Sequence, residues 1–143
     1  MNRLALIGLL LAIAQVLWGQ GAATQSDPGV KLETLKKKED SAKVWRDGEV
    51  VKVQITSVSG IGQAELRRTG DRWPAQLELI FRYGDERPFQ TLEGFGVTIR
   101  GDKGEDMWRH PAEKADPRKP IVIKIPADAG GMRLIVKWID AYR

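Results

Sequence analysis

The chain has 143 residues and no cysteine, which excludes disulfide bonds, a thiolate nucleophile and a cysteine-based zinc site. Its 23 Lys and Arg residues stand against 19 Asp and Glu residues, a formal net charge of +4. This excess is small and the two signs are interleaved, as in residues 36–40. A nucleic-acid-binding protein would be expected to show a one-sign cluster, so we expect no nucleic-acid partner.

The first 23 residues have the layout of a secretory signal peptide. Arg3 precedes an apolar run over residues 4–18, and small residues that include Gly21 and Ala23 follow it. A membrane-spanning helix needs about 20 mostly apolar residues, so the run favours a cleaved leader over an anchor. We expect cleavage after residue 23, or alternatively after Gly21. The expected product is an exported protein, periplasmic or extracellular, with no stable membrane insertion after cleavage.

Residues 24–43 are polar and densely charged. Opposite charges at helical spacing, such as Glu33 with Lys37, are compatible with a short helix. Only Leu32 and Leu35 offer an apolar stripe, however, and a free helix with so little apolar surface is marginal. The range 24–43 is therefore expected to be either a linker or a short helix that leads into the folded domain.

From residue 44 onward the chain shows two-residue alternation of apolar and polar side chains, which indicates half-buried strands. The expected inward residues are Val51, Val53 and Ile55; Ala64 and Leu66; Leu77, Leu79 and Phe81; Phe95, Val97 and Ile99; Ile121, Ile123 and Ile125; and Leu134, Val136 and Trp138. Turn residues such as Asp47-Gly48 separate these runs, and no long amphipathic helix interrupts them. The predicted fold class is all-β, a single antiparallel β-sandwich of roughly seven strands over residues 44–143.

Three segments carry a resemblance to a group of known proteins. The segment ITSVSGIGQAEL (residues 55–66), the pair Trp73-Pro74 and the tail KWIDAYR (residues 137–143) resemble small exported bacterial domains of unknown function. The resemblance covers about residues 44–143. It implies a compact β-rich domain, and it implies no activity, cofactor or site residue.

The long loop predicted over residues 102–120 gathers the groups from which a catalytic site could be built. Asp102, Glu105 and Asp106 form the densest acidic cluster, and His110 is the only histidine. Two carboxylates can hydrolyse a glycosidic bond, so a small hydrolase of envelope polymers is one alternative function. A single imidazole does not make a zinc site, and the acidic spacing does not match a calcium loop. We therefore expect no metal, no cofactor and no catalytic residue.

Tryptophans are the candidates for ligand contacts. Trp108 with its neighbour Arg109, together with Trp73 and Trp45, are the predicted ligand-binding residues, because indoles can stack on sugar rings and arginine can pair with acidic sugars. Trp138 lies in an apolar alternation and is predicted to belong to the core. Burial in the core remains the open alternative for the other three indoles.

The leading functional hypothesis is an exported, non-enzymatic binding or interaction module whose ligand is a glycan or an envelope protein. Export, β architecture and the lack of a catalytic set motivate it. The first alternative is the small hydrolase. The second is a structural subunit that pairs through an edge strand, with Ile135 and Ile139 at the interface.

Overall fold

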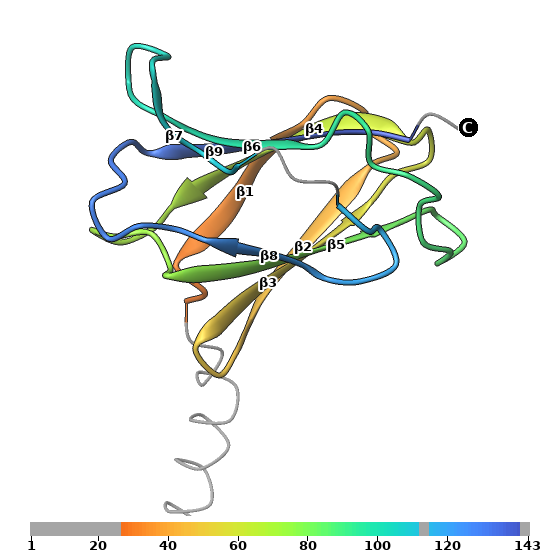
Figure 1. The fold of residues 1–143 in the computed structure, drawn as a ribbon, viewed down its shortest axis with the longest axis horizontal. Helices are drawn as coiled ribbons and strands as arrows, with labels where there is room; N and C mark the ends of the chain where they lie inside the picture. The colour runs from red at the N-terminus through yellow and green to blue at the C-terminus, as the bar shows by residue number, and fades with distance from the viewer. Residues whose placement is uncertain (1–26, 112–114, 141–143) are drawn as a thin grey trace, which may run out of the picture.

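The computed structural model describes residues 27–111 and 115–140, and this part of the chain contains nine β-strands and no helix (Figure 1). The strands are β1 (Val30–Leu35), β2 (Ser41–Asp47), β3 (Val50–Thr56), β4 (Ile61–Arg68), β5 (Gln76–Arg82), β6 (Gly96–Arg100), β7 (Asp106–Arg109), β8 (Ile121–Lys124) and β9 (Arg133–Ile139). No helix suited to crossing a membrane is found in these residues. The predicted signal peptide and its cleavage site lie outside the described residues.

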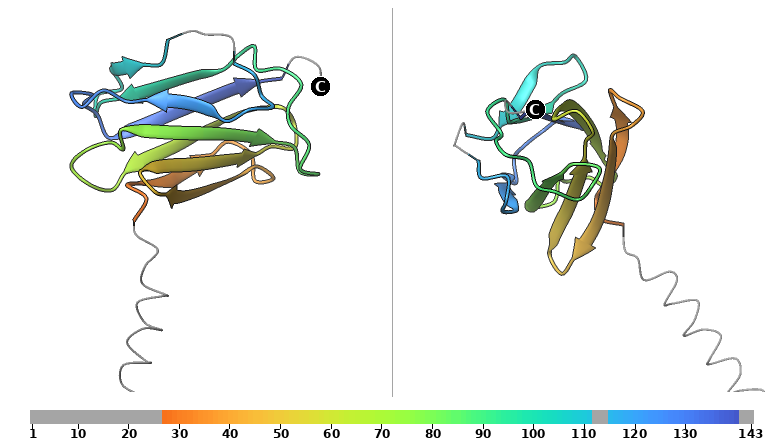
Figure 2. Two further views of the ribbon diagram at one scale, coloured as in Figure 1. Left: turned by 60° about the horizontal axis from the view of Figure 1, so that its bottom comes forward. Right: turned by 90° about the vertical axis from the view of Figure 1, so that its right-hand side faces the viewer.

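The strands form two sheets that pack against each other. One sheet has five strands in the order β1-β4-β9-β6-β7, and the other has four in the order β2-β3-β5-β8. Figure 1 shows β6, β7 and β9 in the upper layer and β3, β5 and β8 in the lower one. At one edge of the sandwich, β1 and β2 come into contact (both orange in Figure 2). The predicted all-β sandwich is confirmed, with nine strands instead of about seven.

The predicted two-residue alternation matches the burial of the central strands. In β3, Val51, Val53 and Ile55 are completely buried, while Lys52 and Gln54 between them are half-buried on the outer face. Side chains from both sheets meet in a single core, whose largest fully buried member is Trp138. Since the protein has no disulfide, this apolar contact between the sheets is what holds them together.

The predicted turn between β2 and β3 is also confirmed. Asp47 pairs with Val50, so Gly48 and Glu49 form a two-residue hairpin loop. Gly48 has a φ of 62°, a conformation that glycine adopts without steric cost.

The expectation of a linker or short helix over residues 24–43 is wrong for Val30–Leu35, which form β1. Val30 is only 1% exposed, and Leu32 pairs with Leu66 of β4. A bulge between Leu32 and Thr34 shifts the register, so that Leu35 packs against the core as well. The charge pairs at helical spacing therefore do not reflect a helix here, and the bulge accommodates the three-residue spacing between Leu32 and Leu35 within a strand.

One strand pairing departs from the predicted antiparallel arrangement. β3 and β5 run parallel, with Val53 opposite Leu79, whereas the other paired strands are antiparallel. The chain between β3 and β5 crosses to the other sheet to form β4 and then returns. A parallel pair needs such a crossover connection, because a tight turn can only join antiparallel strands.

Candidate ligand-binding surface

The structure does not bring the predicted ligand-binding residues together. Trp73 is only 8% exposed and lies in the core, where its Nε1 donates a hydrogen bond of 3.1 Å to the carbonyl oxygen of Gly131. Its indole is thus packed inside the protein, which was the open alternative from the sequence. Trp45 lies half-buried on β2 of the four-stranded sheet, opposite Lys52.

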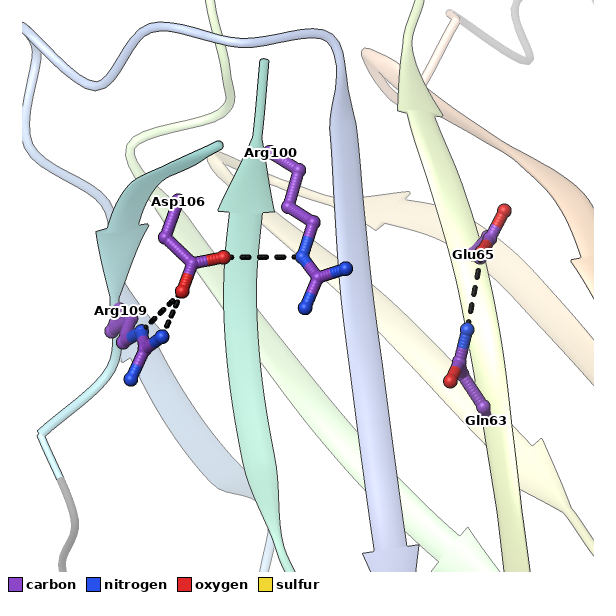
Figure 3. A network of polar contacts seen from close by, with 5 residues as sticks. All are labelled: Gln63, Glu65, Arg100, Asp106 and Arg109. Carbon is purple, nitrogen blue, oxygen red and sulfur yellow. Dashed lines mark hydrogen bonds and ion pairs between the residues drawn. The ribbon is translucent and has the colours of Figure 1, made fainter. Parts of the chain in front are cut away.

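Trp108 and Arg109 lie next to each other on β7, in the five-stranded sheet, but their side chains have different surroundings. Trp108 is half-buried and packs against the core. Arg109 is exposed and bonds to Asp106 on the outer face of the sheet (Figure 3). Trp45, Trp73 and Trp108 therefore form no common platform for a sugar ring.

The acidic cluster of the hydrolase alternative is built into the hairpin of β6 and β7. Asp106 accepts a hydrogen bond of 3.1 Å from Nε of Arg100 and one of 2.8 Å from Nε of Arg109 (Figure 3). The bond from Arg109, followed by the charges of both guanidinium groups, lowers the pKa of Asp106 below its ordinary value of 3.8. Asp106 therefore stays ionised at neutral pH and is unsuited to act as a general acid.

His110 has aromatic surroundings. Its ring centroid lies 6.2 Å from that of Phe95 and 6.4 Å from that of Trp108, and its backbone N–H donates to the carbonyl oxygen of Val97. Phe95, His110 and Lys119 border an open pocket of about 300 Å³.

The bulge between β6 and β7 explains why His110 and Asp106 have such different neighbours. Arg100 pairs with Asp106 but Ile99 pairs with Trp108, so the alternation shifts at Met107. Within the described residues, no three His, Asp or Glu side chains gather as a metal site would require.

The structural-subunit alternative loses one of its two interface residues. Ile135 occupies an outward position of β9 but is only 5% exposed. Glu65 and Thr98 flank it on the neighbouring strands. Ile139 is 43% exposed and lies opposite Ile61, which is 51% exposed, so on β9 only Ile139 keeps the exposed apolar surface that this alternative needs.

A feature that was not predicted crosses the outer face of the five-stranded sheet. Lys31 lies opposite Arg67, Arg67 opposite Arg133, and Arg133 opposite Arg100. These four residues, which we call the cationic row, cross β1, β4, β9 and β6 in register. Because neighbouring strands are about 4.8 Å apart, the row extends over about 14 Å.

The two ends of the cationic row are neutralised, but its centre is not. Lys31 forms an ion pair of 3.4 Å with Glu33 at one end, and Arg100 is bound to Asp106 at the other. Neither Arg67 nor Arg133 forms an ion pair within the described residues. The nearest acidic position of β4, Glu65, accepts a hydrogen bond from Gln63 instead (Figure 3).

Sequence reasoning missed the cationic row because its members come from four strands that are far apart in the chain. Each of the four strands contributes one member, at an outward position. Only the strand order and the register place them next to one another. We expected no cluster of basic residues because charges of both signs alternate along the sequence. Across neighbouring strands, however, four basic residues lie side by side.

No family model matches this chain, and neither a curated protein nor a solved structure matches it. Function is therefore inferred from the geometry of the described residues.

Proposed function

We propose that this protein is an exported, non-enzymatic binding module that holds a component of the cell envelope on the outer face of its five-stranded sheet. The N-terminal sequence supports export, and the cationic row supports the location of the binding surface. Like charges directly opposite each other destabilise a sheet. Arg67 and Arg133 form such a contact at the centre of the row, with no ion pair to offset it within the described residues, and a ligand-binding role would account for it.

The composition of this face also supports binding rather than catalysis. Arginine is always charged and presents five N–H donors in a rigid plane, which suits the recognition of carboxylate or phosphate groups. Two of the ionisable groups that the hydrolase alternative needs, Asp106 and His110, do not form a pair suited to catalysis. Asp106 is held between two guanidinium groups, whereas His110 lies beside the rings of Phe95 and Trp108.

The test is a binding screen in which one face of the protein is blocked without a change of charge. Because the chain has no cysteine, Thr98→Cys places a single thiol on the outer face of the five-stranded sheet. A bulky neutral maleimide can then be attached there. Gln54→Cys, at a half-buried outward position of β3 in the other sheet, is the matched control.

The unlabelled protein is screened against arrayed glycans and purified envelope proteins. We expect binding of at least one defined component, which the label at residue 98 blocks and the label at residue 54 leaves intact. A protein that binds nothing, or whose binding is blocked only by the label at residue 54, would overturn the proposal.

A further inference from the structure

We propose that the ligand of this face is a linear acidic polysaccharide whose carboxylates lie along the cationic row, so that the polymer crosses the strands. This inference rests on the proposed function and specifies the chemistry of the ligand. The centre of the row, Arg67 and Arg133, is where the first contacts are expected. These two side chains lie directly opposite each other and have no acidic partner within the described residues.

The spacing of the row favours a polymer over a small anion. Successive cations are separated by one strand spacing, about 4.8 Å, and four of them follow one direction. A single carboxylate or phosphate contacts only one or two neighbouring arginines. A chain with a negative charge on successive units can contact several of them at once, and each bidentate pair adds affinity and fixes orientation.

The lack of aromatic side chains at the outward positions of this face favours an acidic polysaccharide over other classes of ligand. The outward positions of β4, β9 and β6 carry none. Single-stranded nucleic acids are held by basic grooves that also contain aromatic residues for base stacking, and neutral sugars favour exposed indoles. Within the described residues, this face also has no helix that could enter a DNA groove. Positive charge is therefore the feature of this face that can select a ligand.

Acidic residues limit the row at both ends. Glu33 neutralises Lys31, and Asp106 holds the guanidinium of Arg100 in place through a bond of 3.1 Å (Figure 3). Removing the carboxylate of Asp106 would free Arg100 and Arg109 for a polyanion. The Asp106→Asn variant should therefore bind an acidic polymer more tightly than the wild-type protein does.

The experiment measures binding of polygalacturonate to the purified protein by calorimetry at several salt concentrations. The double variant R67Q/R133Q should bind at least about tenfold more weakly, since hydrogen bonds to charged groups contribute about 1.5–3 kcal/mol each. The variant R67K/R133K keeps both charges but loses the bidentate geometry, and should show intermediate affinity. Binding of the wild-type protein should weaken as salt rises.

The matched control is K43Q/K124Q, which removes two exposed positive charges from the outer face of the four-stranded sheet. It should bind polygalacturonate like the wild-type protein. An equal loss in both double variants would show that only net charge matters, and would overturn the inference. So would binding of duplex DNA as tight as that of polygalacturonate.

The failure of this inference can be told apart from the failure of the proposed function. The screen could find a neutral glycan or a protein whose binding is blocked by the label at residue 98, while polygalacturonate does not bind. In that case only the polysaccharide assignment is wrong. If no component binds at all, both proposals are wrong.

Discussion

Gly62 and Trp138 lie opposite each other on β4 and β9, and the indole of Trp138 occupies the space where a side chain at position 62 would be. A Cβ atom at this position would overlap the indole, at 2.8 Å from Cε2 and closer still to Cζ2. Trp138 is completely buried. The glycine thus makes room for the largest side chain of the core.

The first prediction is that Gly62→Ala destabilises the protein by about 1–3 kcal/mol, because the added methyl group overpacks the core against the completely buried indole of Trp138. Gly70→Ala is the control, since nothing lies within 4 Å of a Cβ there. It should change the free energy of unfolding by less than about 0.5 kcal/mol. Urea denaturation of both variants tests this, and equal stability of the two would contradict it.

The second prediction concerns the stability of the cationic row. Replacing Arg67 and Arg133 with glutamine removes a contact between like charges, so the free energy of unfolding should stay the same or rise by up to about 1 kcal/mol. Binding and stability would then change in opposite directions. Thermal denaturation at low salt, where surface charges are least screened, is the measurement. A clear loss of stability would show that the two arginines serve the fold.

The third prediction is that the ionisation of Asp106 makes the stability of the folded protein depend on pH. Its pKa is lowered in the folded protein by the bond from Arg109 and by the charges of both arginines, so folding favours its ionised form. The wild-type protein should therefore be more stable than Asp106→Asn above pH 3.8, the ordinary pKa value. This advantage should disappear as the pH falls through the lowered pKa.

Melting temperatures of both proteins between pH 7 and pH 2 test this third prediction. Asp102→Asn, which removes an exposed carboxylate from the turn of the same hairpin, is the control. A difference between the wild-type protein and Asp106→Asn that is constant over the whole range would contradict the prediction.

The fourth prediction compares how much Trp73 and Trp45 each contribute to stability. Trp73→Ala should destabilise the protein by about 3–5 kcal/mol, because it removes a buried indole and leaves the carbonyl of Gly131 without its donor. Trp45→Ala should lower the free energy of unfolding by less, since Trp45 is half-buried on the outer face of the four-stranded sheet. Chemical denaturation of both variants decides this, and a larger loss in Trp45→Ala would contradict it.

The sequence predicted the core strands well because their alternation is regular on both sides of the sandwich, as in Val51, Val53 and Ile55. It failed at β1, where a bulge replaced the period of two with a spacing of three. The sequence also placed β7 in a predicted loop. This strand has only four residues, and a register shift interrupts it, so it shows no alternating pattern. Local patterns describe a strand only when its register is unbroken.

The candidate surface was less predictable than the fold for a different reason. The exposure of Trp73 depends on the loop that carries Gly131, which is distant in the sequence. The charge of the outer face depends on which strands are neighbours, and Arg67 meets Arg133 only because β4 pairs with β9. Such properties arise from strand order, which a single sequence does not encode in any local pattern.

The parallel neighbours β3 and β5 have a consequence for how this chain acquires its structure. Since β4 is inserted between them in the sequence and belongs to the opposite layer, neither layer can be finished by the addition of successive hairpins. Many of the contacts that complete the two layers join strands that are distant in the chain, and proteins dominated by such contacts fold slowly, in milliseconds to seconds. We therefore expect a single cooperative transition, with no half-sandwich that persists alone.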